Sequence, residues 1–226
     1  MRAVVIGASG GIGAAIADAL REEGAEVHAF SRSFDGERRI DVADEASVAA
    51  AAARVPAGLD LVIVATGLLH EGGRGPEKAM REVDAEWMGR NFLVNAIGPM
   101  LVAKHFLPHL PRDRRAVFAA LSARVGSISD NRLGGWYGYR ASKAALNQLV
   151  RTLSIEERRR NPQGIVVALH PGTVDTGLSQ PFQGAVQPGR LFAPDRAAVQ
   201  LLDVLDGLKP ADSGRLFDWD GKEVAP

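Results

Sequence analysis

The sequence predicts a doubly wound α/β fold, in which helices cover both faces of a mostly parallel sheet. Short apolar runs alternate with helical patterns along the whole chain, and glycine or proline separates them. A glycine-rich turn joins the first apolar run to the first helical pattern, and no internal repeat or linker divides the chain. We therefore expect one domain over residues 1–226, with three layers in the order helix, sheet, helix.

The elements follow from local patterns taken in order along the chain. The run LDLVIVATG (59–67) is the most apolar and suits an interior strand of a parallel sheet. The alanine-rich segment 44–55 has an acidic first turn and ends near Pro56, as a helix does. Strands are expected at residues 2–6, 25–30, 59–67, 116–121, 164–170 and 214–224, the last at an edge, with a short third strand ending at Asp41-Val42. Helices are expected at residues 14–24, 44–55, 84–110, from the segment with Tyr139 to Arg160, and at 194–208.

The composition is that of an ordinary folded domain. Of the 226 residues, 46% are hydrophobic and 24% are charged, and 27 basic residues balance 27 acidic ones. A net charge of zero argues against a nucleic acid or a membrane surface as partner. The chain has no cysteine, which excludes disulfides, thiolate catalysis and cysteine metal sites, and we expect no metal. No apolar run is as long as a membrane span, and the first strand begins at Arg2, so we expect a cytoplasmic protein.

Two motifs carry chemistry that their residues explain. Gly7, Gly11 and Gly13 form G-x-x-x-G-x-G between a strand and a helix, where backbone amides can bind a pyrophosphate. Tyr139 and Lys143 stand four residues apart, so both side chains leave one face of a helix. A nearby ammonium stabilises the phenolate and lowers the pKa of the phenol, which can then exchange a proton near neutral pH.

A third feature lies in the long helix. Pro99 has no N–H, so the carbonyl of Asn95, four residues earlier, loses its helical partner and can hold a water molecule. The run FLVNAIGPMLVAKHFL (92–107) is apolar on nearly all faces, which is more than one contact with a sheet needs. We therefore expect a homo-oligomer, a dimer or a tetramer.

The glycine spacing together with YRASK (139–143) resembles the short-chain dehydrogenase/reductase family, and further segments match in order over nearly the whole chain. The run GSISDNRLGGWYGYRASKAALN (126–147) and the ending FDWDGK (217–222) are similar to the C-factor and Sniffer-like carbonyl reductases. The resemblance implies a Rossmann-type fold and an NAD(P)-dependent oxidoreductase. It also implies a partner subunit packed on the long helix and on the Tyr139 helix.

The resemblance implies roles for the catalytic residues. Tyr139 is the general acid and base, Lys143 lowers its pKa and holds the ribose, and Asn95 carries a water of the proton relay. The family typically reads Ser-Ser-x-x-Gly, and its second serine polarises the substrate carbonyl. Here LSARVG (121–126) places Ser122 first and Ala123 second. Alternate residues of a strand face opposite sides, so three alternatives stay open: Ser122 at an irregular strand end, Ser127 in the loop, or no serine.

Cofactor contacts also follow from the resemblance. Asp41-Val42 would contact adenine, and Ala65-Thr66-Gly67 stand in place of the family's Asn-Ala-Gly. PGTVDT (171–176) would fix the nicotinamide carboxamide and let Thr176 reach a phosphate. The full expected set is Gly7, Ser9, Gly11, Ile12, Gly13, Arg32, Asp41, Val42, Ala65, Thr66, Gly67, Tyr139, Lys143, Pro171, Gly172, Val174 and Thr176.

The end of the second strand selects between cofactors. An acidic residue there would accept the ribose hydroxyls and select NAD. The strand instead ends Phe30-Ser31-Arg32, with an arginine placed to meet a 2′-phosphate. We therefore expect NADP. NAD stays possible, because Gly10 lacks the additional basic charge of many NADP-dependent members.

The leading function is hydride transfer between nicotinamide and a small carbonyl or alcohol substrate. The alternative is a regulatory or signalling protein that binds NADP(H) with little turnover, and a third reading is reduction of an activated C=C bond. The residues do not identify the substrate. Leu178, Phe182 and Phe192 indicate only a partly apolar pocket, which His70 and Trp136 can border.

Overall fold

The computed structural model describes residues 1–226, apart from the side chain of Ala185. Its centre is a seven-stranded sheet in the order β2-β1-β3-β4-β5-β8-β9, parallel except for the pair β8–β9. The strands of this sheet are β1 (Arg2–Ile6), β2 (Glu26–Phe30), β3 (Leu61–Val64), β4 (Ala116–Leu121), β5 (Gly164–His170), β8 (Leu216–Asp218) and β9 (Glu223–Val224). A separate parallel pair joins β6 (Thr173–Val174) to β7 (Leu191–Phe192). The predicted doubly wound α/β fold is confirmed.

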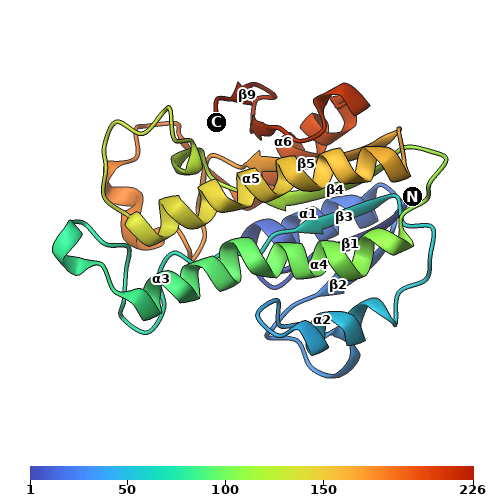
Figure 1. The fold of residues 1–226 in the computed structure, drawn as a ribbon, viewed down its shortest axis with the longest axis horizontal. Coiled ribbons are helices and arrows are strands. Elements are labelled where there is room, and N and C mark those ends of the chain that lie inside the picture. The colour runs from blue at the N-terminus through green and yellow to red at the C-terminus, as the bar shows by residue number, and fades with distance from the viewer.

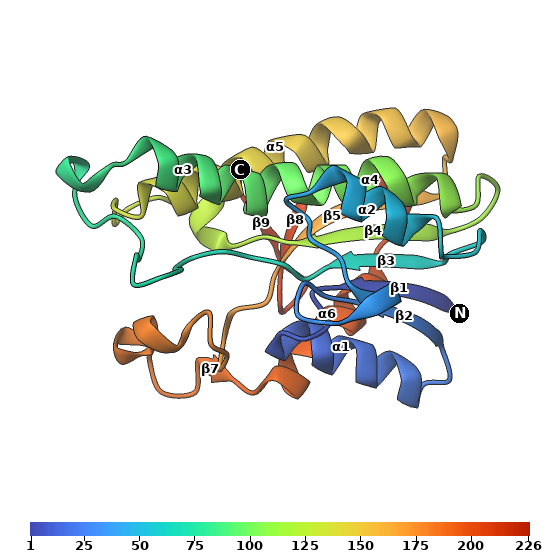
Figure 2. The same cartoon turned by 90° about the horizontal axis from the view of Figure 1, so that it is seen from below.

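Helices cover both faces of the sheet, as Figures 1 and 2 show. The helices are α1 (Gly11–Glu22), α2 (Glu45–Ala52), α3 (Ala85–Phe92), α4 (Gly98–Phe106), α5 (Tyr137–Arg160) and α6 (Pro194–Gly207). Shorter helical turns are η1 (Gly36–Arg38), η2 (Met80–Glu82), η3 (Leu93–Ile97), η4 (Leu107–His109), η5 (Arg124–Gly126), η6 (Gln180–Ala185) and η7 (Pro210–Asp212). Helices α2, α4 and α5 pack on one face, and α1 and α6 pack on the other. Among the helices described, none has both the length and the apolar character to cross a membrane.

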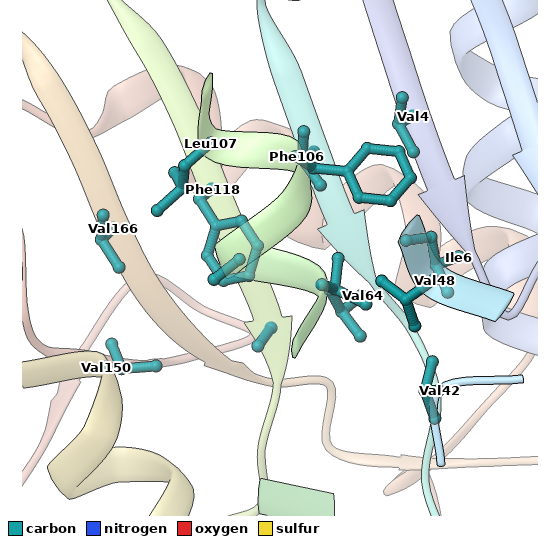
Figure 3. Packing of buried hydrophobic residues seen from close by; sticks show 14 of the residues in the cluster. Val4, Ile6, Val42, Val48, Val64, Phe106, Leu107, Phe118, Val150 and Val166 are labelled. Atoms are coloured by element: carbon teal, nitrogen blue, oxygen red, sulfur yellow. The ribbon is translucent and has the colours of Figure 1, made fainter. Parts of the chain in front are cut away.

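The core consists of two apolar layers, one on each face. Alternate residues of β1 divide between them: Val4 and Ile6 face α2 and α4, and Ala3 and Val5 face α1. In the first layer, on the side of α2, α4 and α5, Phe106 is fully buried (Figure 3). Its ring and that of Phe30 are packed edge to face, with 6.3 Å between their centroids. Because both faces are covered, the strands read as continuous apolar runs in the sequence.

The strand order reverses beside β1, and this reversal positions the functional site. The chain passes from β1 to β2 on one side and then returns to β3 on the other. In such sheets ligands bind at the carboxyl ends of the strands where the order reverses. The glycine turn (residues 7–13) after β1 and residues 65–67 after β3 both lie at this point.

The long helix predicted over residues 84–110 contains a π-turn. In η3 the Gly98 N–H bonds to the carbonyl of Leu93, five residues earlier. This distortion lies directly before Pro99, where we expected a lost hydrogen bond. The rod α3–η3–α4 is nevertheless continuous along the sheet (Figure 1).

Three strand predictions were wrong in detail. The strand predicted at 59–67 is shorter, since β3 covers only Leu61–Val64. Asp41-Val42 do not end a strand, because the Asp41 carboxylate accepts the Ala43 N–H and the Asp41 N–H donates to Ser47, so side-chain bonds replace a ladder. Residues 214–224 form two strands, β8 and β9, instead of one. Gly221, with φ +79°, turns the chain back between them.

We predict that Phe106→Ala lowers the free energy of unfolding by about 3–5 kcal/mol, because it leaves a cavity in the first layer. Denaturation with urea measures this loss. Leu133→Ala, at a side chain 92% exposed, serves as the control and should change stability by less than about 0.5 kcal/mol. A loss below about 1 kcal/mol for Phe106→Ala would contradict the assignment of this ring to the core.

Candidate active site

Two neighbouring cavities open at the carboxyl edge of the sheet, and residues 65–67 line both. The outer cavity, of about 330 Å³, is also lined by the predicted residues Gly7, Ser9, Arg32, Asp41 and Val42. The inner cavity, of about 470 Å³, is also lined by the predicted residues Ile12, Ser122, Tyr139, Lys143, Pro171, Gly172, Val174 and Thr176. The predicted residues that line neither cavity are Gly11, Gly13, Asn95 and Ser127. The two cavities are adjacent and share this segment, so one elongated ligand could occupy both.

Close backbone contacts shape the glycine turn. Gly7 has φ +92°, and a Cβ on it would lie 2.9 Å from the carbonyl carbon of Ala65. A Cβ on Gly13 would overlap the carbonyl oxygen of Gly7, so α1 packs directly on the turn. Gly11 lies against the side chain of Thr176, which therefore reaches the start of α1. No side chain caps the N-terminus of α1, so its first amides can meet a phosphate.

Hydroxyl groups and one arginine line the outer cavity at the end of β2. Ser31 Oγ lies 2.5 Å from Ser9 Oγ and 3.4 Å from Ser33 Oγ. The Arg32 guanidinium lies 3.6 Å from the carboxylate of Glu71, which also pairs with Arg90 at 3.1 Å. Hydrogen bonds from Arg90 hold the pKa of Glu71 below its usual value. No local pattern points to Ser31, Ser33, Glu71 or Arg90, because only folding brings these segments together.

Tyr139 and Lys143 lie together at the floor of the inner cavity, 7% and 2% exposed. Lys143 Nζ donates to the carbonyl of Leu121 at 2.8 Å and lies 5.8 Å from the centre of the Tyr139 ring. Burial lowers the pKa of Lys143 to about 7 and raises the pKa of Tyr139 above its usual value. We had expected Lys143 to lower the pKa of Tyr139. In this arrangement the desolvation of the phenol outweighs the attraction of a partly neutral amine.

Asn95 lies in η3 and is fully buried. Its Oδ1 accepts the Leu68 N–H at 2.7 Å, and its Nδ2 donates to the Leu68 carbonyl at 2.8 Å and to Ser142 Oγ at 3.1 Å. Ser142 in turn donates to the carbonyl of Tyr139 at 2.8 Å. Asn95 therefore ties the segment after β3 to the helix that carries the Tyr139–Lys143 pair. The water of the proton relay stays a prediction.

The structure separates the serine candidates. Ser122 lines the inner cavity, and its Oγ donates to Asn147 Oδ1 at 2.7 Å. Ala123 packs against Tyr139, so a methyl group lies beside the phenol. Ser127 is buried in the loop, where its Oγ accepts the Asp130 N–H at 3.2 Å. Of the two serines, Ser122 is the one that lies at the cavity with Tyr139.

Two buried polar atoms at the inner cavity have no partner among the described residues. They are Thr66 Oγ1, in the segment shared by both cavities, and His170 Nδ1, at the end of β5. Burial lowers the pKa of His170 to about 4, so its ring is neutral at pH 7. Buried polar atoms are normally hydrogen-bonded, so both indicate a polar ligand. A dinucleotide fits these features, because the glycine turn could hold a pyrophosphate and the two cavities could hold its ends.

Aromatic side chains stand at the mouth of the inner cavity. The ring of Trp136 lies 6.1 Å from that of Tyr139 and 5.1 Å from that of Phe182, edge to face in both pairs. His70 borders this group, 6.0 Å from Phe182. Leu178 lines the cavity as expected, but Phe192 packs against Trp219 at 4.8 Å and does not line it. The pocket is therefore apolar on one side.

Comparisons with known proteins agree with this site. The family model described as short chain dehydrogenase matches residues 1–186. C-signal of Myxococcus xanthus is 43% identical over 147 residues, which are 65% of this chain and 82% of that protein. The 1-hydroxy-2-glutathionyl-2-methyl-3-butene dehydrogenase of Rhodococcus sp. (strain AD45) is 32% identical over 231 residues, 96% of each chain. The NADPH-bound carbonyl reductase from chicken fatty liver is 28% identical, with a TM-score of 0.84 over 100% of this chain and 94% of that one. The predicted resemblance to C-factor and Sniffer-like carbonyl reductases is confirmed.

We predict that the unfolding free energy of the wild type rises between pH 7 and pH 9. The folded state binds fewer protons than the unfolded state between about pH 7 and the ordinary lysine value of 10.5, because burial lowers the pKa of Lys143. The rise is at most about 1.4 kcal/mol per pH unit. Lys143→Met removes the amine and this part of the rise. Urea denaturation at pH 7, 8 and 9 measures the unfolding free energy of both proteins. An equal change with pH in wild type and Lys143→Met would contradict the prediction.

Proposed function

The chain belongs to the short-chain dehydrogenase family, and on this basis we propose that it is an NADPH-dependent carbonyl reductase. One observation carries the proposal: the Tyr139–Lys143 pair lines an inner cavity that shares residues 65–67 with the hydroxyl-lined outer cavity. A dinucleotide that extends through both cavities would present its nicotinamide beside Tyr139. The same pair would serve the reverse reaction, the oxidation of an alcohol.

In the proposed reaction, NADPH held in the two cavities would supply the hydride for the carbonyl carbon. Tyr139 donates its phenolic proton to the carbonyl oxygen as negative charge develops there. The phenol is protonated at neutral pH, since its ordinary pKa lies near 10 and burial raises the pKa of Tyr139 further, so the proton is in place at the start. Lys143 holds the ribose and, when protonated, stabilises the phenolate that remains. Asn95 holds the helix in place and would anchor the relay water.

We propose Ser122 as the group that polarises the carbonyl. It lines the inner cavity with Tyr139, whereas Ser127 lies outside it. The Ser122 hydroxyl donates to Asn147 and must turn from it to reach a substrate. Ala123, beside the phenol, offers no hydrogen bond. Polarisation of the substrate carbonyl therefore depends more on Tyr139 than it would with a hydroxyl at position 123.

The choice of NADP over NAD rests on the end of β2. Arg32 and the hydroxyls of Ser9, Ser31 and Ser33 line the outer cavity together. A 2′-phosphate held here would accept hydrogen bonds from these groups and would pair with the guanidinium. Two carboxylates line this cavity. Glu71 is paired with Arg90 and Arg32, and Asp41 accepts the Ala43 N–H. The NADPH named with the chicken liver structure supports the same choice.

A second candidate function is a regulatory or signalling role, with NADP(H) bound and little turnover. The methyl group of Ala123 beside Tyr139 and the similarity to C-signal favour it. A pure sensor needs no acid placed against a buried lysine, so the Tyr139–Lys143 pair favours the enzyme. The purified protein with NADPH, tested on aldehydes, ketones, quinones and activated alkenes, separates the two. Binding of NADPH without any turnover would support the sensor.

We also propose that two copies associate along α4 and α5. Ile97 of η3 and Ile155 of α5 are 45% and 49% exposed, on helices that run side by side (Figure 1). Large apolar side chains exposed on adjacent helices are typical of an interface. A tetramer and a cytoplasmic location stay predictions.

We predict that Tyr139→Phe lowers kcat at least about 100-fold with any carbonyl compound the wild type reduces, because the proton donor is lost. The dissociation constant for NADPH should change by less than about threefold, since the ring remains. Tyr137→Phe, at the half-exposed tyrosine two residues earlier on α5, is the matched control. Full turnover by Tyr139→Phe would show that another group donates the proton.

We predict that Arg32→Ala weakens NADPH binding about tenfold and leaves NADH binding unchanged. An exposed charge-assisted contact of this kind contributes about 1–2 kcal/mol. Titration of the intrinsic fluorescence gives both dissociation constants. Arg38→Ala, which removes a nearby exposed arginine that does not line the cavity, is the control. Equal losses for NADPH and NADH would mean that Arg32 does not contact the 2′-phosphate.

A further inference from the structure

The helix that carries Tyr139 begins without a cap of its own. Trp136, at the N-cap position of α5, makes no side-chain hydrogen bond to the helix, and the first turn has no acidic residue. Trp136 also has φ +53°, a left-handed conformation that non-glycine residues rarely adopt. The first amides of a helix have no partner within it, so something outside α5 has to satisfy them.

Glu77 supplies this cap from a distant loop. Its Oε2 accepts the N–H of Gly138 at 3.0 Å, across 61 residues of sequence, and its main-chain carbonyl accepts the N–H of Trp136. Glu77 is 3% exposed, although it carries a carboxylate. A negative charge at a helix N-terminus is stabilised by the amides it faces. The side chain and the main chain of Glu77 thus each bind one backbone N–H, that of Gly138 and that of Trp136, which lie on either side of Tyr137.

Gly138 is matched to this carboxylate. A Cβ on Gly138 would lie 2.9 Å from Glu77 Oε1 and 3.5 Å from Asn91 Nδ2. The carboxylate therefore occupies the space that a side chain at position 138 would need. Glu77 Oε1 itself has no partner among the described residues. An acceptor that is this buried and lies against a glycine is suited to fixing the position of the backbone, not to contact with solvent.

The position of Tyr139 depends on both hydrogen bonds of Glu77, the one from Gly138 and the one from Trp136. It directly follows Gly138 in the chain, and its carbonyl is held from the other side by Ser142. The ring of Trp136, whose backbone Glu77 holds, packs against the ring of Tyr139. A shift at Gly138 therefore moves the phenol relative to Lys143, which is anchored separately on Leu121.

We propose that Glu77 is a positioning residue for Tyr139, acting through the N-terminus of α5. The proposal rests on the proposed reductase function, in which Tyr139 is the proton donor. Glu77 does not line the inner cavity, so its effect belongs to the placement of the phenol and not to contact with a substrate. A displacement of about 1 Å at a reacting group can cost about 100-fold in rate.

The test compares Glu77→Leu, which has no acceptor, with Glu77→Gln, whose amide oxygen can still accept the Gly138 N–H. We expect Glu77→Leu to lower kcat about 10- to 100-fold, with the NADPH dissociation constant within about threefold of wild type. Glu77→Gln should keep kcat within about threefold. Glu82→Gln, at an exposed glutamate of the same segment whose carboxylate accepts the Lys78 N–H, is the matched control. A folded Glu77→Leu protein with wild-type kcat would overturn the proposal.

A pair of further variants tests the fit between Glu77 and Gly138. Gly138→Ala alone should lower kcat, because the new methyl group meets Oε1. In a Glu77→Ala background the same change should cost less than about twofold, since the space is then open. Additive losses in the double variant would overturn the proposed contact.

Hydrogen exchange at the Gly138 amide, measured without substrate, separates this proposal from the proposed function. We expect exchange about tenfold faster in Glu77→Leu than in wild type, and close to wild type in Glu77→Gln. Unchanged exchange in Glu77→Leu would overturn the capping contact. A wild-type protein that reduces none of the carbonyl compounds would overturn the reductase function, while the exchange rates would still decide the role of Glu77 at the helix start.

Discussion

The site depends on a close backbone approach between the glycine turn after β1 and the end of β3. Because Gly7 has no side chain, the carbonyl of Ala65 lies against the turn, and α1 packs on the same turn through Gly13. That approach makes residues 65–67 a shared wall of both cavities. Asn95 then ties the next residue, Leu68, to η3 and to α5. The outer and the inner cavity are therefore coupled through one short segment.

Local sequence patterns predicted those strands and helices that depend mainly on interactions between residues close together in the chain. The runs AVFAAL and GIVVALH form β4 and β5 with the expected bounds, because short apolar runs between polar loops become buried strands. The Tyr139–Lys143 pair follows equally from its spacing on a helix. The unpredicted features depend on contacts between residues far apart in the chain. Neither the contact of Glu77 with Gly138 nor the packing of Phe192 on Trp219 leaves a local pattern.

The pKa values of the Tyr139–Lys143 pair likewise depend partly on local sequence and partly on the rest of the fold. Five residues, YRASK, are enough to place a cation near a phenol, and that proximity alone favours the phenolate. They do not reveal how completely the rest of the fold covers the two groups. Burial acts on both, lowering the pKa of Lys143 and raising that of Tyr139, and it outweighs their attraction. The charge state of the site is thus a property of the whole packed structure.

The parallel pair β6–β7 has a consequence for how substrate preference can change. The connection between these strands, residues 175–190, contributes Leu178 and Phe182 to the inner cavity, while main-chain bonds hold its two ends next to each other. A loop closed in this way can vary in length and side chains without displacing the elements it leaves. Tyr139 and Lys143 belong to α5, and the glycine turn belongs to β1 and α1. The part of this loop that follows Thr176 can therefore be exchanged as a unit, which changes the lining of the inner cavity while these elements stay in place.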